Sequence, residues 1–316
     1  MSSLQHDFGF DSSKEEAFPN YIMYDIVNVC NATCPHCPQS LIASDKNYKP
    51  LYLQWDVYEK SIKEVAQYKT ELVRFTGDGE PLIHPRLPEM IKKAKSLGIP
   101  KVNLTTNGSL LSGRKLDNLL ECPPDIFDVS LDAYHPETFS VRRGGLNFDE
   151  VKKNVINLTK LAPQNNFKVI VSFINEPGLE SEVERFKAFW KDRVDFVAVR
   201  SMHSNLGLSG LGSTDKSNLS KLQRWPCQHL WRRLVIDYRG HIRYCPVDWL
   251  DQTSLGAVSA MSLHEAWHSD RLRQLRTQHT MLAFDSESPC ANCSDWSSSP
   301  WNVGWMQMIK TYLDNN

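Results

Sequence analysis

The stretch CNATCPHC, residues 30 to 37, decides how the rest of the chain is interpreted. Its three cysteines, Cys30, Cys34 and Cys37, have the spacing Cys-x3-Cys-x2-Cys, in a chain of 316 residues with eight cysteines altogether. The stretch directly follows YIMYDIVNV (21–29), an apolar and β-branched segment that is typical of a buried strand. Three thiols grouped on a loop after a strand indicate metal binding or redox chemistry rather than a structural disulfide.

The strand-then-helix unit that begins there recurs along the chain. Further strands are predicted at 71–77, 101–108, 125–133, 167–175 and 194–202, and helices at 53–68, 87–98, 113–121, 148–161 and 182–192. Strands that alternate with helices imply a parallel sheet with right-handed crossovers. Six strands are too few for an eightfold barrel, so we predict an α/β fold, a partial (β/α)6 barrel, over residues 1–203.

The pattern changes after residue 203. A Gly/Ser-rich connection (203–220) leads to an alternating segment (230–245) that is typical of a hairpin turning at Arg239-Gly240. Helical patterns follow near 263–278 and 303–313. Residues 204–316 are therefore predicted to form a second, smaller module of a β-hairpin plus helices.

Charge and composition exclude several classes of function. The chain has 36 basic and 37 acidic residues, which leaves no overall field to attract nucleic acid or anionic lipid. The first 18 residues lack the features of a signal peptide, and no later stretch reaches the length of about 20 apolar residues that spans a membrane. We therefore expect a cytoplasmic protein with no nucleic-acid partner and no membrane segment. The reducing cytoplasm disfavours disulfides and favours metal-binding cysteines.

Three neighbouring cysteines suit one cofactor better than others. Structural zinc takes four protein ligands, and His36 is the only local candidate for the fourth, in a cramped chelate. Three cysteines that hold a 4Fe-4S cluster leave one iron open to a ligand from elsewhere. At this point the chain resembles the radical S-adenosylmethionine (SAM) superfamily, which carries this motif after its first barrel strand. The resemblance implies that the open iron chelates the amino and carboxylate groups of SAM.

Further motifs carry the same resemblance along the predicted strands. TGDGEP (76–81) is similar to the family's Gly-Gly-Glu-Pro stretch, with Asp78 in place of the first glycine, and RRGG (142–145) also recurs in the family. LTTNG (104–108) and VSLDA (129–133) resemble the third- and fourth-strand motifs. The SAM contacts that the resemblance implies are His36 near the adenine, Gly79, Glu80 and Pro81 near the methionine amino group, Thr105 and Asn107 near the methionine and ribose, and Ser130 and Asp132 near the ribose or carboxylate.

Four of these residues have a simpler alternative role. Glu80 would be an ordinary surface carboxylate, and Asn107-Gly108 is a good turn pair in any protein. Ser130 and Asp132 would cap the next element.

Four more cysteines lie in the second module. Cys227 and Cys245 flank the predicted hairpin, and Cys290 and Cys293 form a CANC knuckle. By chemistry alone, four thiolates can hold zinc or an iron-sulfur cluster. The pattern resembles the twitch domain, a shortened SPASM extension, which implies one auxiliary 4Fe-4S cluster and two such clusters in all. Four cysteines also separate this chain from the molybdenum-cofactor GTP cyclases, whose second cluster has three.

The resemblance implies a radical enzyme. A reductant such as flavodoxin or ferredoxin supplies an electron, SAM yields a 5'-deoxyadenosyl radical, and the radical abstracts a substrate hydrogen. A barrel with one fully ligated auxiliary cluster resembles the dehydrogenase that oxidises 2-deoxy-scyllo-inosamine, so we expect oxidation of an aminocyclitol or sugar-like small molecule. Arg200 and His203, at the end of the sixth strand, are the candidate catalytic residues. Their alternatives are a salt-bridged barrel residue and an ordinary loop histidine.

Other functions stay open at this stage. Peptide modification is one, although only about 20 residues precede the first strand where relatives often carry a leader-recognition domain of about 80 residues. Radical epimerisation is another, with Cys122 as the one thiol outside both clusters. A zinc-stapled binding protein is the non-enzyme alternative, and iron analysis distinguishes it from the others.

Overall fold

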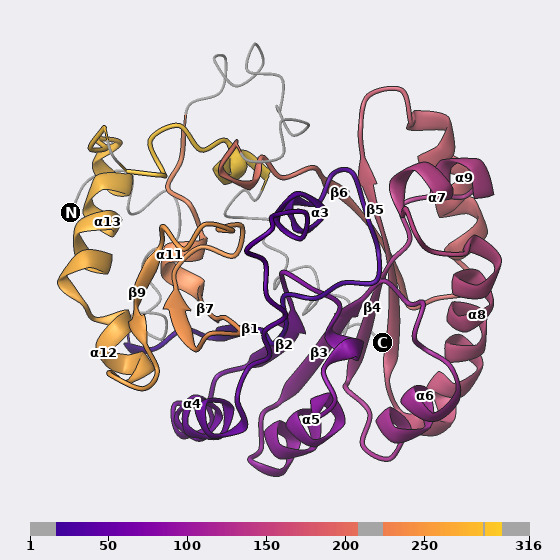
Figure 1. Ribbon diagram of the computed structural model, residues 1–316, viewed down its shortest axis with the longest axis horizontal. Coiled ribbons are helices and arrows are strands. Elements are labelled where there is room, and N and C mark those ends of the chain that lie inside the picture. The colour runs from indigo at the N-terminus through magenta and orange to yellow at the C-terminus, as the bar shows by residue number, and fades with distance from the viewer. Residues whose placement is uncertain (1–16, 208–223, 287, 299–316) are drawn as a thin grey trace.

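The computed structural model describes residues 17–207, 224–286 and 288–298. The predicted Gly/Ser-rich connection lies partly outside these residues, and the predicted helix near 303–313 lies entirely outside them. The strands form one curved sheet with helices along its outer side (Figure 1).

The predicted α/β partial barrel is confirmed. Six parallel strands come from the first two thirds of the chain, in the order β6-β5-β4-β3-β2-β1. Their bounds are β1 Tyr21–Asp25, β2 Leu72–Thr76, β3 Lys101–Thr106, β4 Ile126–Ser130, β5 Lys168–Asn175 and β6 Phe196–Ser201. The strand predicted at 21–29 is too long, because the chain leaves the sheet after Asp25 to form the loop that carries the cysteines.

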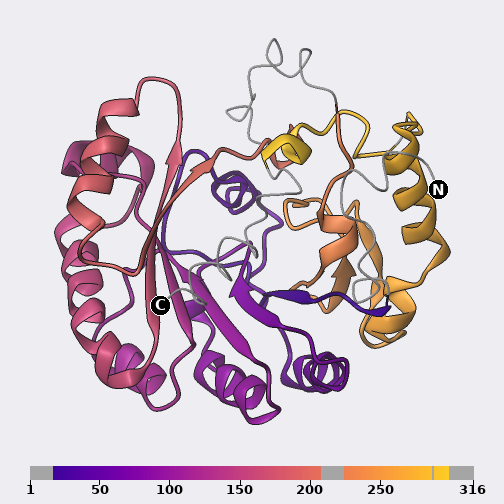
Figure 2. The same cartoon turned by 180° about the vertical axis from the view of Figure 1, so that it is seen from behind.

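Helices follow the strands, and the longer ones cover the convex face of the sheet, whereas the short helix α3 lies above the carboxyl ends of the strands (Figures 1 and 2). The helices are α3 Pro38–Ile42, α4 Trp55–Gln67, α5 Leu87–Ser96, α6 Gly113–Leu120, α7 Pro136–Arg142, α8 Phe148–Asn165 and α9 Glu180–Trp190. α3 and α7 were not predicted, since both are short and begin at a proline rather than with an apolar repeat.

Alternate residues of the strands face two different environments. Residues such as Ile22, Phe75 and Leu104 join the large core between sheet and helices. Their neighbours along each strand, including Tyr21, Arg74 and Asp128, face the inner, concave side, because side chains alternate along a strand. The inner face carries charged side chains, which is where a barrel of this kind holds its ligands.

The second module continues the same sheet. β7 (Arg233–Ile236) pairs in parallel with β1, and β8 (His241–Arg243) and β9 (Ser254–Ala257) extend it antiparallel. The predicted hairpin is confirmed, and its turn contains Gly240 with φ +83. β9 was not predicted, since SLGA has no alternating pattern. The helix predicted at 263–278 is two helices, α12 (Leu263–Trp267) and α13 (Asp270–Met281), each with its own serine N-cap. A one-turn helix, α11 (His229–Arg232), precedes β7.

Helix α4 fastens the second module to the barrel. Its Glu64 carboxylate accepts hydrogen bonds from the backbone N–H groups of Leu263 and His264, at the start of α12. Lys60, one turn earlier, donates to the Val258 carbonyl. The module boundary predicted at 203/204 stays a prediction, but the sheet and these contacts run across it.

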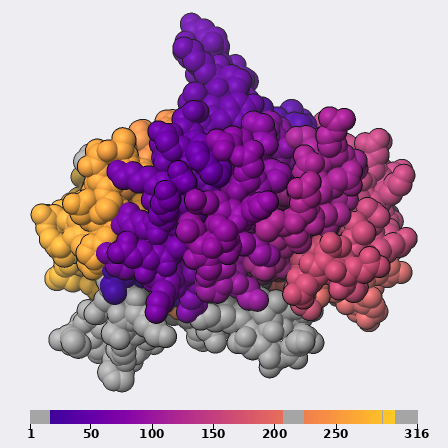
Figure 3. All heavy atoms as spheres, turned by 90° about the horizontal axis from the view of Figure 1, so that it is seen from below, coloured from indigo at the N-terminus to yellow at the C-terminus, as the bar shows by residue number. Residues whose placement is uncertain are grey.

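Seen from below, the orange and yellow atoms of the second module lie at one end of the molecule, and the pink atoms of the last barrel units lie at the other (Figure 3). Within the described ranges, no helix is both long enough and apolar enough to cross a bilayer.

Candidate functional site

The first three cysteines lie on the loop between β1 and α3. The backbone N–H of Cys37 donates to the Cys34 carbonyl (3.1 Å), and the N–H of Ala32 points to the Cys30 sulfur (3.5 Å). Burial raises the pKa of the Cys30 thiol to about 11 and that of Cys37 to about 12. Such desolvated thiols ionise when a cation coordinates them, which is the behaviour of metal ligands.

Arg143 from the RRGG stretch closes over this loop. Its guanidinium donates to the Cys34 sulfur (3.6 Å) and pairs with Asp132 at 2.5 Å. Beside it, the Thr33 N–H donates to the Gly144 carbonyl (2.7 Å), and a side chain on Gly144 would begin 2.7 Å from the Thr33 hydroxyl oxygen. The loop of RRGG therefore supports the cysteine loop directly, a role that the sequence motif alone did not reveal.

His36 and Asp132 lie together next to Arg143. The His36 Nε2 atom is 3.7 Å from an Asp132 carboxylate oxygen. Burial and the positive charge of Arg143 lower the pKa of His36 to about 4, against the opposite effect of Asp132, so the ring is neutral at pH 7. The other Asp132 oxygen accepts from the Ile174 N–H (2.6 Å). Asp132 thus has protein partners on both oxygens, and the roles of both residues toward SAM stay predictions.

Glu80 is buried and bonded within the protein rather than exposed. One carboxylate oxygen accepts from the Leu82 N–H (3.1 Å) and the Thr106 hydroxyl (2.6 Å), and the other accepts from the Asn107 N–H (2.8 Å). The alternative of a surface carboxylate is therefore wrong, since Glu80 is 2% exposed. Its carboxylate holds the end of β3 in place, while its contact with the methionine amino group stays a prediction.

Gly79 has no room for a side chain. A β-carbon there would meet the backbone oxygens of Val29 at 2.3 Å and Val27 at 2.6 Å. The neighbouring Glu80 N–H donates to that same Val29 carbonyl (2.8 Å). The backbone of the 76–81 loop therefore packs closely against residues 27–29, which lead into the cysteine loop.

The remaining predicted SAM contacts lie at the same ends of the strands. Asn107 donates to the Asn31 side chain (2.9 Å) and lies 4.0 Å from the Cys30 sulfur. Ser130 is in register with Ser172 of β5, and Pro81 begins the short 3-10 helix η1 (Pro81–Ile83). Thr105 accepts from Arg74 (2.7 Å), so it belongs to the inner network of the barrel.

The other four predicted ligand cysteines share one cavity. Cys227, Cys245, Cys290 and Cys293 all line it, together with Arg224, His279 and Asp295. Arg224 donates to the carbonyls of Cys290 (2.6 Å) and Ala291 (3.0 Å), and the Cys227 N–H donates to His279 (3.2 Å). The structure therefore brings together the thiols from the hairpin and the knuckle, and it adds Arg224 and His279, which the spacing of cysteines did not reveal.

Arg200 and His203 lie at the end of β6, on the inner side of the sheet. Arg200 pairs with Asp128 (2.5 Å) and approaches the Ser172 hydroxyl at 3.4 Å. The His203 side chain is 43% exposed, but its Nδ1 atom is buried and lies 3.9 Å from an Asp295 carboxylate oxygen beside the second cysteine cavity. His203 thus lies between the barrel interior and that cavity, while Arg200 is salt-bridged and still 25% exposed.

Comparison with protein-family models decides what these sites are. The model of the radical SAM superfamily matches residues 24–185, which is about half of the chain. The chain belongs to the radical SAM superfamily. A second model, SPASM, described as an iron-sulfur cluster-binding domain, matches residues 227–294 and so includes all four cysteines of the second cavity.

Curated relatives cover only part of this radical SAM protein. A GTP 3',8-cyclase of Chlorobaculum tepidum is 36% identical over 42% of this chain and 39% of its own length. A GTP 3',8-cyclase of Limosilactobacillus fermentum is 30% identical over 62% of this chain and 64% of its own. A 7,8-dihydro-6-hydroxymethylpterin dimethyltransferase of Methanocaldococcus jannaschii is 33% identical over 55% and 34%. The chain thus spans less than two thirds of each of these relatives.

Solved structures share the fold over nearly the whole chain. SuiB of Streptococcus suis, bound to the precursor peptide SuiA, has a TM-score of 0.68 at 14% identity, over 96% of this chain and 76% of its own. BtrN, in complex with AdoMet and 2-DOIA, has a TM-score of 0.61 at 16% identity, over 88% and 93%. At these identities the likeness concerns the fold alone.

This radical SAM enzyme therefore has a SAM-binding iron-sulfur cluster and an auxiliary iron-sulfur cluster. Cys30, Cys34 and Cys37 suit the first, since they are buried, close in sequence and supported by Arg143. Cys227, Cys245, Cys290 and Cys293 suit the second, since they line one cavity and all lie within the residues that the SPASM model matches. The assignment of individual ligands and SAM contacts remains a prediction.

A buried ion cluster links the radical SAM loop to the SPASM region. Arg243 of β8 is 2% exposed, donates to Asp25 at the end of β1 and to the Asp248 carbonyl, and lies 3.6 Å from Asp78. Asp78 is the residue that departs from the family's first glycine. Arg243, two positions before Cys245, therefore compensates that departure, which no sequence pattern indicated.

We expect Arg243→Met to destabilise the protein strongly. Removing the guanidinium leaves the buried carboxylates of Asp25 and Asp78 without their cation, which should lower the free energy of unfolding by about 3–5 kcal/mol. Denaturant unfolding of the variant measures it. Arg239→Met is the matched control, because Arg239 is 34% exposed in its ion pairs and should cost about 0–1 kcal/mol. Equal losses in the two variants would contradict the role given to Arg243.

Asp78 also makes stability depend on pH. Burial raises the pKa of Asp78 to about 6, against the effect of Arg243 and with further raising by Asp237. A carboxyl whose folded pKa is raised stabilises the fold at low pH, and this contribution is lost as pH rises through about 6. From pH 5 to pH 7, the unfolding free energy of the wild type should therefore fall by about 1 kcal/mol relative to Asp78→Asn. Urea titrations at both pH values measure the difference, and a constant difference would contradict the raised pKa.

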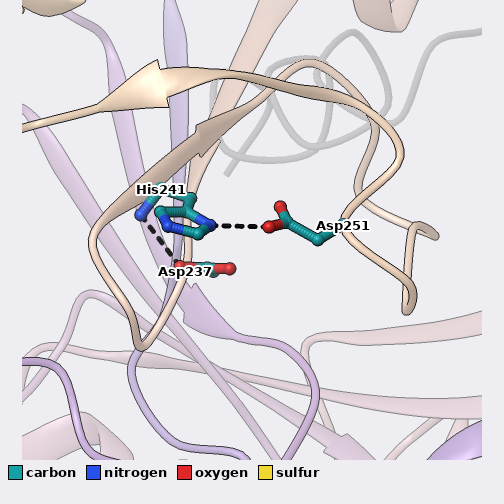
Figure 4. A group of neighbouring side chains, drawn as sticks. All are labelled: Asp237, His241 and Asp251. Atoms are coloured by element: carbon teal, nitrogen blue, oxygen red, sulfur yellow. Dashed lines mark hydrogen bonds and ion pairs between the residues drawn. The ribbon is translucent and has the colours of Figure 1, made fainter.

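A second group of charged residues near this cluster is structural. Asp237, His241 and Asp251 have ligand-type atoms within 4.8 Å of one another (Figure 4). However, His241 is bonded to Asp251 at 2.8 Å, and Arg239 lies 3.6 Å from Asp237 and 3.5 Å from Asp251. Since the Arg239 guanidinium already supplies positive charge to both carboxylates, we interpret this group as one that stabilises the hairpin turn and not as a metal site.

Proposed function

We propose that this radical SAM enzyme oxidises a secondary alcohol of an aminocyclitol or sugar-like small molecule and passes one substrate electron to the auxiliary cluster. The observation that carries the proposal is the cavity lined by four cysteines. A cluster with a thiolate on each iron has no vacant position for substrate, so electron transfer is the role open to it.

When bound, the clusters and SAM supply the 5'-deoxyadenosyl radical and accept the electron that the substrate loses. The substrate alcohol gives up a hydrogen atom from carbon to that radical, a proton from its hydroxyl group and one electron, and leaves as a ketone. Flavodoxin or ferredoxin is the expected class of protein reductant for the first cluster.

Two residues of the chain can act on the substrate hydroxyl group, one on its proton and one on its oxygen. His203 has a pKa lowered by burial and by neighbouring arginines, opposed by Asp295, so its ring is neutral near pH 7 and can accept the hydroxyl proton. Arg200 keeps guanidinium N–H groups at the inner side of the sheet and can donate to the substrate oxygen. His203 lies beside the auxiliary cavity, so the proton of the substrate would leave on the same side as the electron that the auxiliary cluster accepts.

The position of Cys122 weighs against epimerisation. Cys122 follows α6 and precedes β4, so it lies at the amino ends of the strands. The cysteine loop follows the carboxyl end of β1, at the opposite end of the parallel sheet. A thiol that returned hydrogen to the substrate radical would need to lie at the carboxyl ends, and the other seven cysteines are predicted cluster ligands.

Product analysis tests the proposal. The anaerobically reconstituted protein is incubated with SAM, a reductant and candidate polyols, sugars and peptides, and products are followed by mass spectrometry. The proposal predicts one ketone, two mass units lighter than the alcohol, for each 5'-deoxyadenosine formed. Modified peptide in place of ketone, or an epimer of unchanged mass, would overturn it.

A further inference from the structure

Three arginines project to the inner face of the barrel from different strands. Arg74 lies on β2, Arg200 on β6 and Arg233 on β7. The register Tyr21↔Arg233 and Met23↔Arg74 places two of them on the face of β1 opposite the large core. Arg200 is in register with Ile174, two residues from Ser172, and its contacts are with Ser172 and Asp128 on the same face.

One carboxylate serves two of these arginines. The same Asp128 oxygen accepts from Arg74 at 3.0 Å and from Arg200 at 2.5 Å, and Asp128 is fully buried. A second carboxylate on the inner face, that of Asp25 on β1, is bonded to Arg243. The Asp128 carboxylate is therefore shared by two arginines, and the Asp25 carboxylate is already paired with a third, Arg243.

Arg233 forms no ion pair with an aspartate or glutamate among the described residues, and the acidic groups that act on its charge are the Tyr21 hydroxyl and the Cys227 thiol. Its guanidinium stacks on the Tyr21 ring, 4.7 Å from the centroid, and one nitrogen lies 3.8 Å from the Met23 sulfur. Its Nε atom is buried with no hydrogen-bond partner in the described part of the chain. Tyr21 and Met23 are apolar supports that orient the guanidinium without neutralising it.

The positive charges of Arg74, Arg200 and Arg233 all act on the same side chain, His203. The pKa of His203 is lowered by burial and, in spite of Asp295, by the positive charges of Arg200, Arg233 and Arg74 together. Arg200 and Arg74 keep 25% and 12% of their side chains exposed, so the inner face is accessible to a ligand. Arg74 and Arg200 share the Asp128 carboxylate, and Arg233 forms no ion pair with a described carboxylate, so the inner face carries positive charge that an anionic ligand would neutralise.

We propose that the inner face of the barrel binds an oxyanion of the substrate, a phosphate or a carboxylate group, between Arg233 and the Arg74–Asp128–Arg200 cluster. Guanidinium forks match the geometry of both oxyanions. The inference rests on the proposed oxidation and narrows its substrate class. Within that class, it favours a sugar acid or a sugar phosphate over an aminocyclitol, whose ammonium group would meet positive charge.

Equilibrium binding without a reductant tests this subsite. The reconstituted protein, saturated with SAM so that the SAM carboxylate position is filled, is titrated calorimetrically with glucose 6-phosphate, gluconate, glucose and glucosamine. We expect one or both of the anionic sugars to bind, and glucose and glucosamine to bind at least tenfold more weakly. The preferred anionic sugar distinguishes phosphate from carboxylate.

Variants locate the binding. Arg233→Met should weaken the preferred anion by about ten- to a hundredfold, and Arg233→Lys by less, because the charge remains without the fork. Arg193→Met, an exposed arginine after the outer helix α9, should change nothing. Iron content and SAM affinity, measured on every variant, establish that the protein is intact.

The outcomes separate the subsite from the proposed oxidation. Equal affinity of wild type and Arg233→Met for both anions, or tighter binding of glucosamine than of the anions, overturns the subsite. If the anion binds through Arg233 but no ketone forms under reducing conditions, the oxidation fails and the subsite stands. If a neutral polyol is oxidised and neither anion binds, the oxidation stands and the subsite fails.

Discussion

Cys34→Ala is expected to abolish reductive cleavage of SAM. Cys34 is 5% exposed, lies between the other two cysteines of the loop and accepts a hydrogen bond from Arg143. Its loss removes one of the three predicted protein ligands, so the first cluster should not assemble. Iron content should fall from about eight to about four per chain, and 5'-deoxyadenosine should fall to the background of protein-free mixtures.

Cys122→Ala is the matched control for that variant. Cys122 is free and lies near the amino end of β4, away from both predicted clusters. It should retain about eight irons and full SAM cleavage. Normal 5'-deoxyadenosine formation by Cys34→Ala would show that Cys34 is not a ligand of the SAM-binding cluster.

Cys245→Ala should have an equally large effect, but on a different step. Cys245 lines the second cavity and follows β8, so its removal should take away one predicted ligand of the auxiliary cluster and leave the cysteine loop unchanged. Ketone formation should fall to background, while 5'-deoxyadenosine still forms because the first cluster is intact. Mass spectrometry of both products in one reaction measures this uncoupling.

A contrasting result would be equally informative. If Cys245→Ala formed ketone at the wild-type rate, the auxiliary cluster would not be the electron acceptor. Circular dichroism and SAM affinity provide the structural control, because β8 also carries Arg243 and a folding defect would lower both products together.

Much of the barrel could be predicted because its signals are local. The strands of the barrel are rich in apolar and β-branched residues, and the long helices, such as α4 and α8, repeat their apolar residues at helical spacing. The cysteine motif lies in eight consecutive residues, so its chemistry could also be read directly. Strand β9 was not predicted because SLGA is short, and its pairing with β8, which the sequence does not show, makes it a strand.

Parts of the site depend on residues distant in sequence and could not be predicted. Arg243 meets Asp25 across 218 positions, and Arg143 meets Cys34 across 109. No spacing rule connects such pairs, because the fold alone brings them together. The same is true of Arg233, whose significance depends on the strand pairing of β7 with β1.

Some motif residues have protein partners that refine their expected roles. Glu80 and Asp132 are expected to meet SAM directly, and that expectation stays a prediction. Within the protein, the Glu80 carboxylate bonds to the end of β3, and the Asp132 carboxylate bonds to Ile174 of β5 and to Arg143. In both positions a buried carboxylate organises the backbone at the carboxyl ends of the strands. The geometry is therefore that of a pre-formed site, held by charges that are satisfied within the protein.

The most direct test of the account is electron paramagnetic resonance of the reduced, fully reconstituted protein with and without SAM. The account predicts signals from two 4Fe-4S clusters, of which one changes its g values when SAM binds its open iron and the other does not. Signals that both stay unchanged on addition of SAM, or a protein that binds zinc in place of iron at the second site, would contradict it.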